Sequence, residues 1–132
     1  MKKTSKLYAL IHGKCPSCRR GEIFSGTIYG FNIQRTLHSC SHCNQRFEIE
    51  PGYFYAAMYV SYAMNMAEMI SVGFATYFLS GGRLDFDSIW IYVATILGSS
   101  ILLSPFNYRY SRIILLHLLS PKIKYNQAYD KP

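Results

Sequence analysis

Two cysteine pairs, Cys15-Pro16-Ser17-Cys18 and Cys40-Ser41-His42-Cys43, decide how the first part of this chain folds, and 21 residues (19–39) separate them. Each pair carries two thiolates on one tight turn, and two such turns can close a tetrahedron around a thiophilic cation. The pattern predicts a structural metal site. Zinc is the expected ion, with iron as the second choice because four-thiolate tetrahedra accept both. The expected ligands are Cys15, Cys18, Cys40 and Cys43.

Other arrangements of the same residues remain open. The four cysteines could form two disulfides, and His38 or His42 could replace one cysteine as a ligand. The basic N-terminus precedes only a short apolar patch, Leu7 to Ile11, so we expect no cleavable signal peptide. A reducing compartment, where paired cysteines usually hold metal, favours the all-cysteine site.

Residues 1–52 are expected to form a zinc-ribbon-like β module with a basic lead-in. They carry too few aliphatic side chains to hold together by a core alone. Metal binding would supply folding free energy on the order of 10 kcal/mol. After the second pair, Phe47 and Ile49 alternate with charged residues, which is the period of a half-buried strand.

Two apolar stretches follow, and together they predict a transmembrane helical hairpin at 53–108. The first, 54–79, has 26 residues and a single charge, so as a helix it exceeds the ~30 Å hydrocarbon core of a bilayer. A short polar turn precedes the second, 88–108, whose 21 residues also reach across. Pro105 would kink this helix, which membrane helices tolerate.

The last part, 109–132, is expected to hold a short interfacial helix and a polar C-terminal tail. Residues 113–119 form an apolar patch between basic flanks, a pattern typical of a helix lying in the plane of a membrane surface. The fold class predicted for the whole chain is therefore a small membrane protein. It consists of a four-cysteine ribbon, two transmembrane α-helices and this interfacial helix.

The distribution of positive charge predicts the orientation. Eight Lys/Arg precede the first span, five follow the second, and the connecting loop has one. Under the positive-inside rule the protein is multi-pass in the cytoplasmic membrane with both termini cytoplasmic. Nucleic-acid binding by the basic head is an alternative use of the same charge, but we do not expect it because the membrane already explains the charge.

Polar residues inside the first span are the least expected feature of the sequence. Asn65 and Glu68 share one helix face, and a carboxylate there costs several kcal/mol unless it is protonated or paired. A proton, ion or cofactor contact is one interpretation. The favoured interpretations are packing against the second span, through Thr95, Ser99 or Ser100, and docking to another membrane protein.

The residues present favour an interaction role over catalysis. There is no Ser/His/Asp arrangement, no phosphate-binding glycine loop and no pair of carboxylates for acid–base work, so we expect no enzyme and identify no small-molecule substrate. The expected function is that of a non-enzymatic membrane accessory, assembly or interaction protein, with the lipid bilayer and a larger membrane protein complex as partners. Metal delivery or thiol redox work is an alternative, and the methionines at 58, 64, 66 and 69 also allow a copper hypothesis.

With these features in place, the chain resembles a bacterial family of small membrane proteins with no established activity, domain of unknown function 983 (DUF983). The resemblance covers about residues 13–122, and Asn65 and Glu68 depart from its pattern. It implies a ribbon-like head on the cytoplasmic face of the bacterial inner membrane, two transmembrane helices and metal ligands at the four cysteines. For some members it also implies a setting near respiratory oxidase assembly genes, hence metal delivery or redox work linked to respiratory complex assembly. The match rests on Cys15-Pro16-Ser17-Cys18-Arg19, Gly21, Phe24, Cys40-Ser41-His42-Cys43, Phe47 and Gly52-Tyr53.

Overall fold

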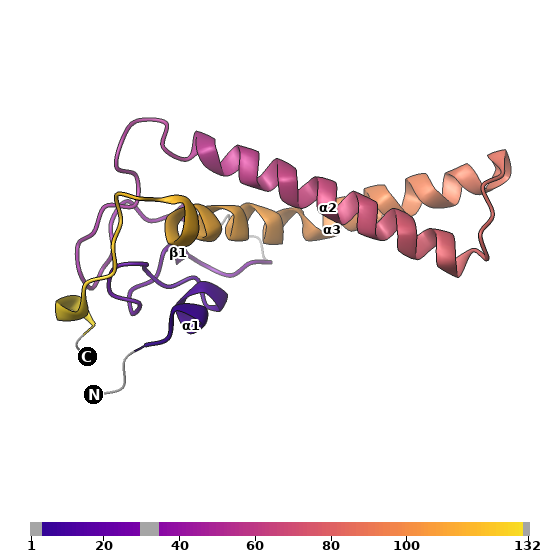
Figure 1. The fold of residues 1–132 in the computed structure, drawn as a ribbon. Helices are drawn as coiled ribbons and strands as arrows, with labels where there is room; N and C mark the ends of the chain where they lie inside the picture. The colour runs from indigo at the N-terminus through magenta and orange to yellow at the C-terminus, as the bar shows by residue number, and fades with distance from the viewer. Residues whose placement is uncertain (1–3, 30–34, 131–132) are drawn as a thin grey trace.

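The computed structural model describes residues 4–29 and 35–130, which form a small head and a long helical hairpin (Figure 1). The hairpin consists of α2 (Tyr55–Leu79) and α3 (Ile89–Ile114), which pack against each other along their length. Both ends of the described chain lie at the head, and the turn between α2 and α3 lies at the far end of the molecule.

The head is a minimal ribbon built from turns. It opens with the short helix α1 (Lys6–Ile11), and its only two-stranded ladder within the described residues pairs β1 (Phe24–Ser25) antiparallel to β2 (Arg35–Thr36). Isolated antiparallel bridges, 14 with 22 and 39 with 46, close one loop around each cysteine pair. The close approach of the four cysteines supports the predicted ribbon-like module, and its strands are short.

Glycines end α2 and let the chain reverse. Gly81 has φ of 73° just after the helix, in the left-handed region that glycine occupies without steric cost. The Gly82 N–H donates to the Tyr77 carbonyl at 3.0 Å and the Gly81 N–H to Phe78 at 3.3 Å, the bond pattern of a Schellman motif. A 3₁₀ turn, Phe86–Ser88, then leads directly into α3.

Of the two expected membrane spans, the structure supports one. Among the described residues, one helical segment, Phe86–Leu119, is long and apolar enough to cross a membrane. The other expected span, 54–79, does form a helix of sufficient length. Its tyrosines and the polar pair Asn65 and Glu68 lower its hydropathy.

The prediction of a short interfacial helix at 113–119 is wrong. The helix continues through Pro105 to Ile114 and then through a π-helical turn, Leu115–Leu119. Ile113 and Leu116 are buried in the head, with at most 1% of their surfaces exposed. The apolar patch is thus core material for a head that lacks aliphatic side chains of its own.

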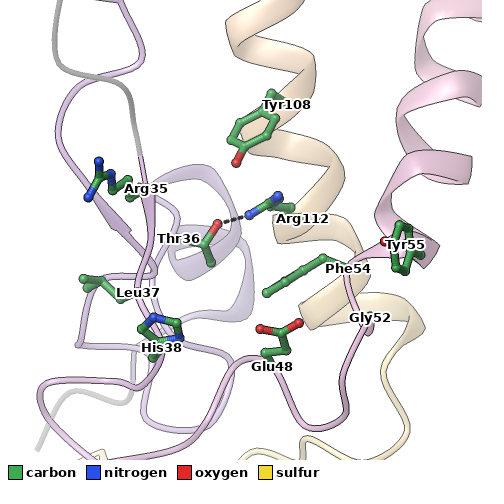
Figure 2. A pocket seen from close by; sticks show the side chains of 10 residues that line it. All are labelled: Arg35, Thr36, Leu37, His38, Glu48, Gly52, Phe54, Tyr55, Tyr108 and Arg112. Carbon is green, nitrogen blue, oxygen red and sulfur yellow. Dashed lines mark hydrogen bonds between the residues drawn. The ribbon is translucent and has the colours of Figure 1, made fainter.

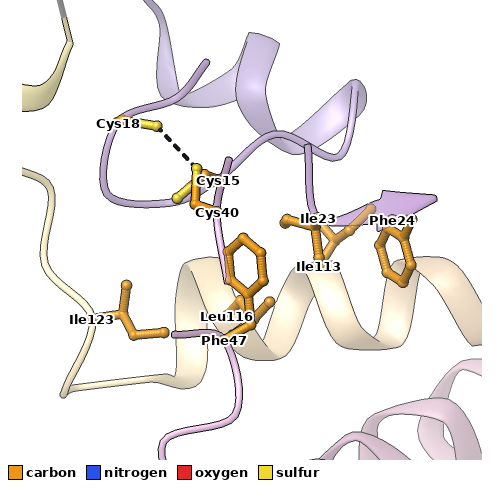
Figure 3. Packing of buried hydrophobic residues seen from close by; sticks show 9 residues of the cluster. All are labelled: Cys15, Cys18, Ile23, Phe24, Cys40, Phe47, Ile113, Leu116 and Ile123. Carbon is orange, nitrogen blue, oxygen red and sulfur yellow. Dashed lines mark hydrogen bonds between the residues drawn. The ribbon is translucent and has the colours of Figure 1, made fainter. Parts of the chain in front are cut away.

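The core of the head is therefore shared between distant parts of the chain (Figure 3). Side chains from the cysteine loops meet the end of α3 and Ile123 from the following segment. The buried members of this core are Cys15, Cys18, Ile23, Phe24, Cys40, Phe47, Ile113, Leu116 and Ile123. Phe47 is fully buried as its alternation with charged residues predicts, although its segment forms no strand beyond the bridge at Arg46.

The expected polar tail is folded back on the head. Asp130 accepts hydrogen bonds from the Thr4 N–H and hydroxyl, both at 3.1 Å, and forms an ion pair with Arg20 at 3.0 Å. The Tyr125 hydroxyl donates to the same carboxylate at 2.8 Å. These contacts join the two ends of the described chain, so residues up to 130 belong to the head.

Candidate metal centre

The four cysteine sulfurs form one compact cluster. All four Sγ atoms lie within 4.8 Å of one another, with Cys15 and Cys43 3.8 Å apart and Cys18 and Cys40 3.6 Å apart. A regular tetrahedron with metal–sulfur bonds of about 2.3 Å has sulfur–sulfur edges of about 3.8 Å. The residues present therefore fit a four-thiolate metal ion.

The two cysteine loops have the same backbone geometry. The Arg19 N–H donates to the Cys15 carbonyl at 2.8 Å, and the Asn44 N–H donates to the Cys40 carbonyl at 3.0 Å. Both donors follow the second cysteine of their pair, and both have left-handed φ values, 57° and 55°. Non-glycine residues adopt this conformation at a cost of about 1–2 kcal/mol, so the surrounding structure must hold it.

Backbone N–H groups point at the sulfurs and suit a charged cluster. The Gly21 N–H donates to Cys18 Sγ at 3.5 Å, and the His42 N–H donates to Cys40 Sγ at 3.4 Å. Such donors stabilise the thiolate form, which is the form that binds metal. Gly21 has a second role, because a Cβ at this position would lie 2.2 Å from Cys40 Sγ.

Burial makes the site closed. Cys15, Cys18 and Cys40 have no exposed surface, and Cys43 is partly buried. Without metal, burial raises the pKa of the Cys15 thiol and raises that of Cys43 to about 11. Burial also opposes ionisation of Cys18, but N–H donors from Gly21 and Arg20 and the neighbouring thiols lower its pKa overall. Metal binding must therefore displace protons from several thiols.

Two arginines next to the first pair bind the chain ends. The Arg19 guanidinium donates to the Thr4 carbonyl at 2.7 Å and lies 3.8 Å from the centre of the Tyr125 ring. Arg20 makes the ion pair with Asp130 already described. These contacts fix the left-handed Arg19 from outside, so the metal loop and the folded-back tail support each other.

The structure favours the all-cysteine arrangement over the alternatives. All four cysteines are free rather than disulfide-bonded. Within the described part of the chain, the cluster of candidate ligands contains the four cysteines and neither His38 nor His42. The predicted ligand set therefore comes together as one potential metal site.

A second polar cluster lies between the two long helices. The Asn107 side-chain amide donates to Asn65 Oδ1 at 2.5 Å and to Glu68 Oε2 at 2.9 Å. The prediction that Glu68 pairs with Thr95, Ser99 or Ser100 is wrong. Thr95 instead shares a 3.1 Å hydrogen bond with Thr76. Glu68 Oε1 is buried without a hydrogen-bond partner among the described residues.

Sequence reasoning missed Asn107 and the packing role of Gly21. An amide two residues after a helical proline, inside an apolar run, is the signal that could have identified Asn107 as the partner of the first helix. Of the methionines of the copper hypothesis, Met58, Met66 and Met69 are exposed on α2.

No family model, no curated protein and no solved structure matches this chain significantly.

Proposed function

We propose that this protein is a non-enzymatic membrane accessory or assembly protein. A structural zinc ribbon on the cytoplasmic face would serve as the interaction module, and the hairpin would dock a larger membrane complex. The closed cysteine cluster carries the proposal, because four thiolate ligands leave a zinc ion no open position for substrate. When bound, the ion would supply folding free energy rather than chemistry.

Both long helices would cross the membrane as one hairpin. α2 has 25 residues, enough to span, and its Asn65 and Glu68 side chains accept hydrogen bonds from Asn107 inside the hairpin. The outer faces of both helices are apolar and exposed, as in Phe74, Phe78, Ile101 and Leu102. An exposed apolar surface of this extent fits a bilayer or a membrane partner.

Two features of the cluster count against thiol redox work. The cluster is buried, and its four cysteines form one closed set.

The test is purification of the tagged full chain from its own membranes in mild detergent. We expect about one zinc per chain and a stoichiometric membrane protein partner. Cys40→Ser should lose both, whereas Ser41→Ala, in the same loop on an exposed residue, should keep both. Recovery of the chain without a partner, or with substoichiometric labile copper, would contradict the accessory function and favour metal delivery.

A further inference from the structure

A hollow of about 580 Å³ lies where the head meets the two long helices (Figure 2). Its walls come from β2, from the segment that leads into α2, and from the last turns of α3. The charged and polar side chains that line it are Arg35, Thr36, His38, Glu48, Tyr108 and Arg112.

Arg112 is the centre of this hollow. Its guanidinium lies 4.7 Å from the ring centre of Phe54 and 4.4 Å from that of Tyr108, so two aromatic faces hold it. It donates a hydrogen bond to the Thr36 hydroxyl. In the part of the chain that the structure describes, no carboxylate lies within ion-pair distance of it. A guanidinium that is fixed in place and still has unused N–H donors suits a phosphate or carboxylate ligand.

The position of Arg112 along α3 indicates which anion it meets. At 1.5 Å per residue, Arg112 lies about 36 Å from Ser88, where the hairpin turn ends. The hydrocarbon core is about 30 Å thick and the bilayer with its headgroups about 40–45 Å. With the hairpin turn at one surface, Arg112 lies at the depth of the phosphate groups on the other.

A second groove, of about 380 Å³, leads from Arg112 into the hairpin. It shares Phe54, Tyr108 and Arg112 with the first hollow and passes Met58 and Tyr62 between α2 and α3. The hydroxyl-bearing residues Ser61, Ser104 and Ser111 line it. An amphiphile with its phosphate at Arg112 could place its ester oxygens and the start of its chains here.

Glu48 gives the hollow an opposite charge on the head side. It lines the same space as Arg112, and no ion pair joins it to a described residue. A carboxylate here disfavours a headgroup that is only anionic and favours one that carries an ammonium beyond its phosphate.

We propose that this hollow binds the headgroup of an amino-phospholipid of the phosphatidylethanolamine type, with Arg112 on the phosphate and Glu48 facing the ammonium. The proposal rests on the membrane placement above and adds a specific lipid to it. It gives the junction between ribbon and hairpin a ligand that exists only in a membrane.

The experiment is native mass spectrometry of the zinc-loaded full chain in detergent, titrated separately with phosphatidylethanolamine and phosphatidylglycerol. We expect the first lipid to bind about tenfold more tightly, and Arg112→Gln to weaken its binding by about tenfold, as loss of a charge-assisted contact does. The matched control is Arg109→Gln. Arg109 lies one turn earlier on α3 and contacts the Phe24 ring and the Gly26 carbonyl instead, so this change should leave lipid binding unaltered.

Glu48→Gln tests the headgroup without removing the phosphate contact. We expect it to remove the preference between the two lipids while binding persists. Equal losses in Arg112→Gln and Arg109→Gln, or no lipid preference in the wild type, would overturn the proposal. So would displacement of the bound lipid by millimolar inorganic phosphate, since the site would then take a free anion.

A carbonate wash of membranes separates this proposal from the one on which it rests. A chain that stays in the membrane but shows no lipid preference refutes the lipid site alone. A chain released by carbonate refutes the membrane placement as well.

Discussion

At the scale of single residues, the metal cluster depends on how closely the two cysteine loops approach each other. Gly21 of the first loop lies against the Cys40 sulfur of the second, and Arg19 and Asn44 hold matching left-handed conformations. The cysteines provide the ligands, but these neighbouring residues determine whether four sulfurs can reach one ion.

Gly21→Ala should therefore disrupt the cluster. The added Cβ would lie 2.2 Å from Cys40 Sγ, and Cys40 cannot move away without leaving the metal. Overpacking of a buried site typically costs about 1–3 kcal/mol, and we expect loss of stoichiometric zinc, measured by elemental analysis. Gly98→Ala is the control, because nothing lies within 4 Å of a Cβ there. Full zinc content in Gly21→Ala would contradict this account.

The polar contact between the helices also acts through single residues. Asn107→Leu would leave Asn65 and Glu68 without their donor and should destabilise the hairpin by about 1–3 kcal/mol. Glu68→Gln should be tolerated, because an amide oxygen can still accept the Asn107 hydrogen bond. The measurement is thermal unfolding in detergent. If Glu68→Gln lowered the melting temperature and Asn107→Leu did not, the Asn107 amide would not be the donor that stabilises the hairpin.

At the scale of elements, α3 belongs to both halves of the molecule. Its first turns pair with α2 in the hairpin, and its last turns supply the core of the head. Its side chains also bond to the head directly. The Tyr110 hydroxyl donates to the Ile11 carbonyl at 2.9 Å, and a ring nitrogen of His117 lies 2.8 Å from the Lys14 carbonyl. One continuous helix thus connects the metal site to the hairpin.

Leu116→Ala tests this role of the helix end. Leu116 is 1% exposed, and truncating a buried leucine costs about 2–5 kcal/mol, so the head should unfold at lower denaturant concentration and lose zinc more readily. Leu118→Ala is the matched control on a side chain that is 57% exposed. If the segment lay on a membrane surface instead, the two changes would have similar effects on zinc retention.

At the scale of the whole molecule, both ends of the described chain lie at the head and the hairpin turn lies far from them. If the hairpin crosses the membrane, the head and both ends are on one side and residues 81–88 on the other. Under the positive-inside rule, the excess of Lys and Arg at the head predicts that this side is the cytoplasmic one.

Labelling with a membrane-impermeant maleimide on intact cells checks this topology. Asp85→Cys, on the hairpin turn, should react from outside, and Gln127→Cys, on the head, should react only after the membrane is opened. Both positions are exposed, so accessibility rather than burial decides the result. External labelling of Gln127→Cys would refute a cytoplasmic head.

The contact between the chain ends predicts a pH dependence. Burial alone would raise the pKa of Asp130, but hydrogen bonds from Tyr125 and Thr4 and the charge of Arg20 together lower it below 3.8. The charged form is thus favoured in the folded state. Its contribution to stability is present above the ordinary aspartate pKa and is lost as the pH falls through the lower folded-state value.

Asp130→Asn makes this contribution measurable. At neutral pH the variant should melt several degrees below the wild type, since about 1 kcal/mol shifts the melting temperature of a small domain by about 4–8 °C. The difference should shrink as the pH falls below 3.8, with zinc content monitored at each pH. A difference that is independent of pH would show that the charge of Asp130 does not matter.

The sequence by itself determined the local features of this protein. The spacing of the cysteines predicted that the four sulfurs come together, because two tight turns with two thiols each need little else to form one cluster. The long apolar runs identified the first helix and the start of the second to within one residue, since helical length and apolarity are local properties. The second helix continues six residues beyond its expected end at 108.

Only the tertiary structure decided which distant residues meet. The apolar patch at 113–119 has the same sequence pattern whether it lies on a membrane or inside the head. It becomes core because the ribbon has too few aliphatic side chains to close without it. The pairing of Asn107 with Asn65 and Glu68 depends on the rotation and register of two helices, which hydrogen bonding fixes only once they pack.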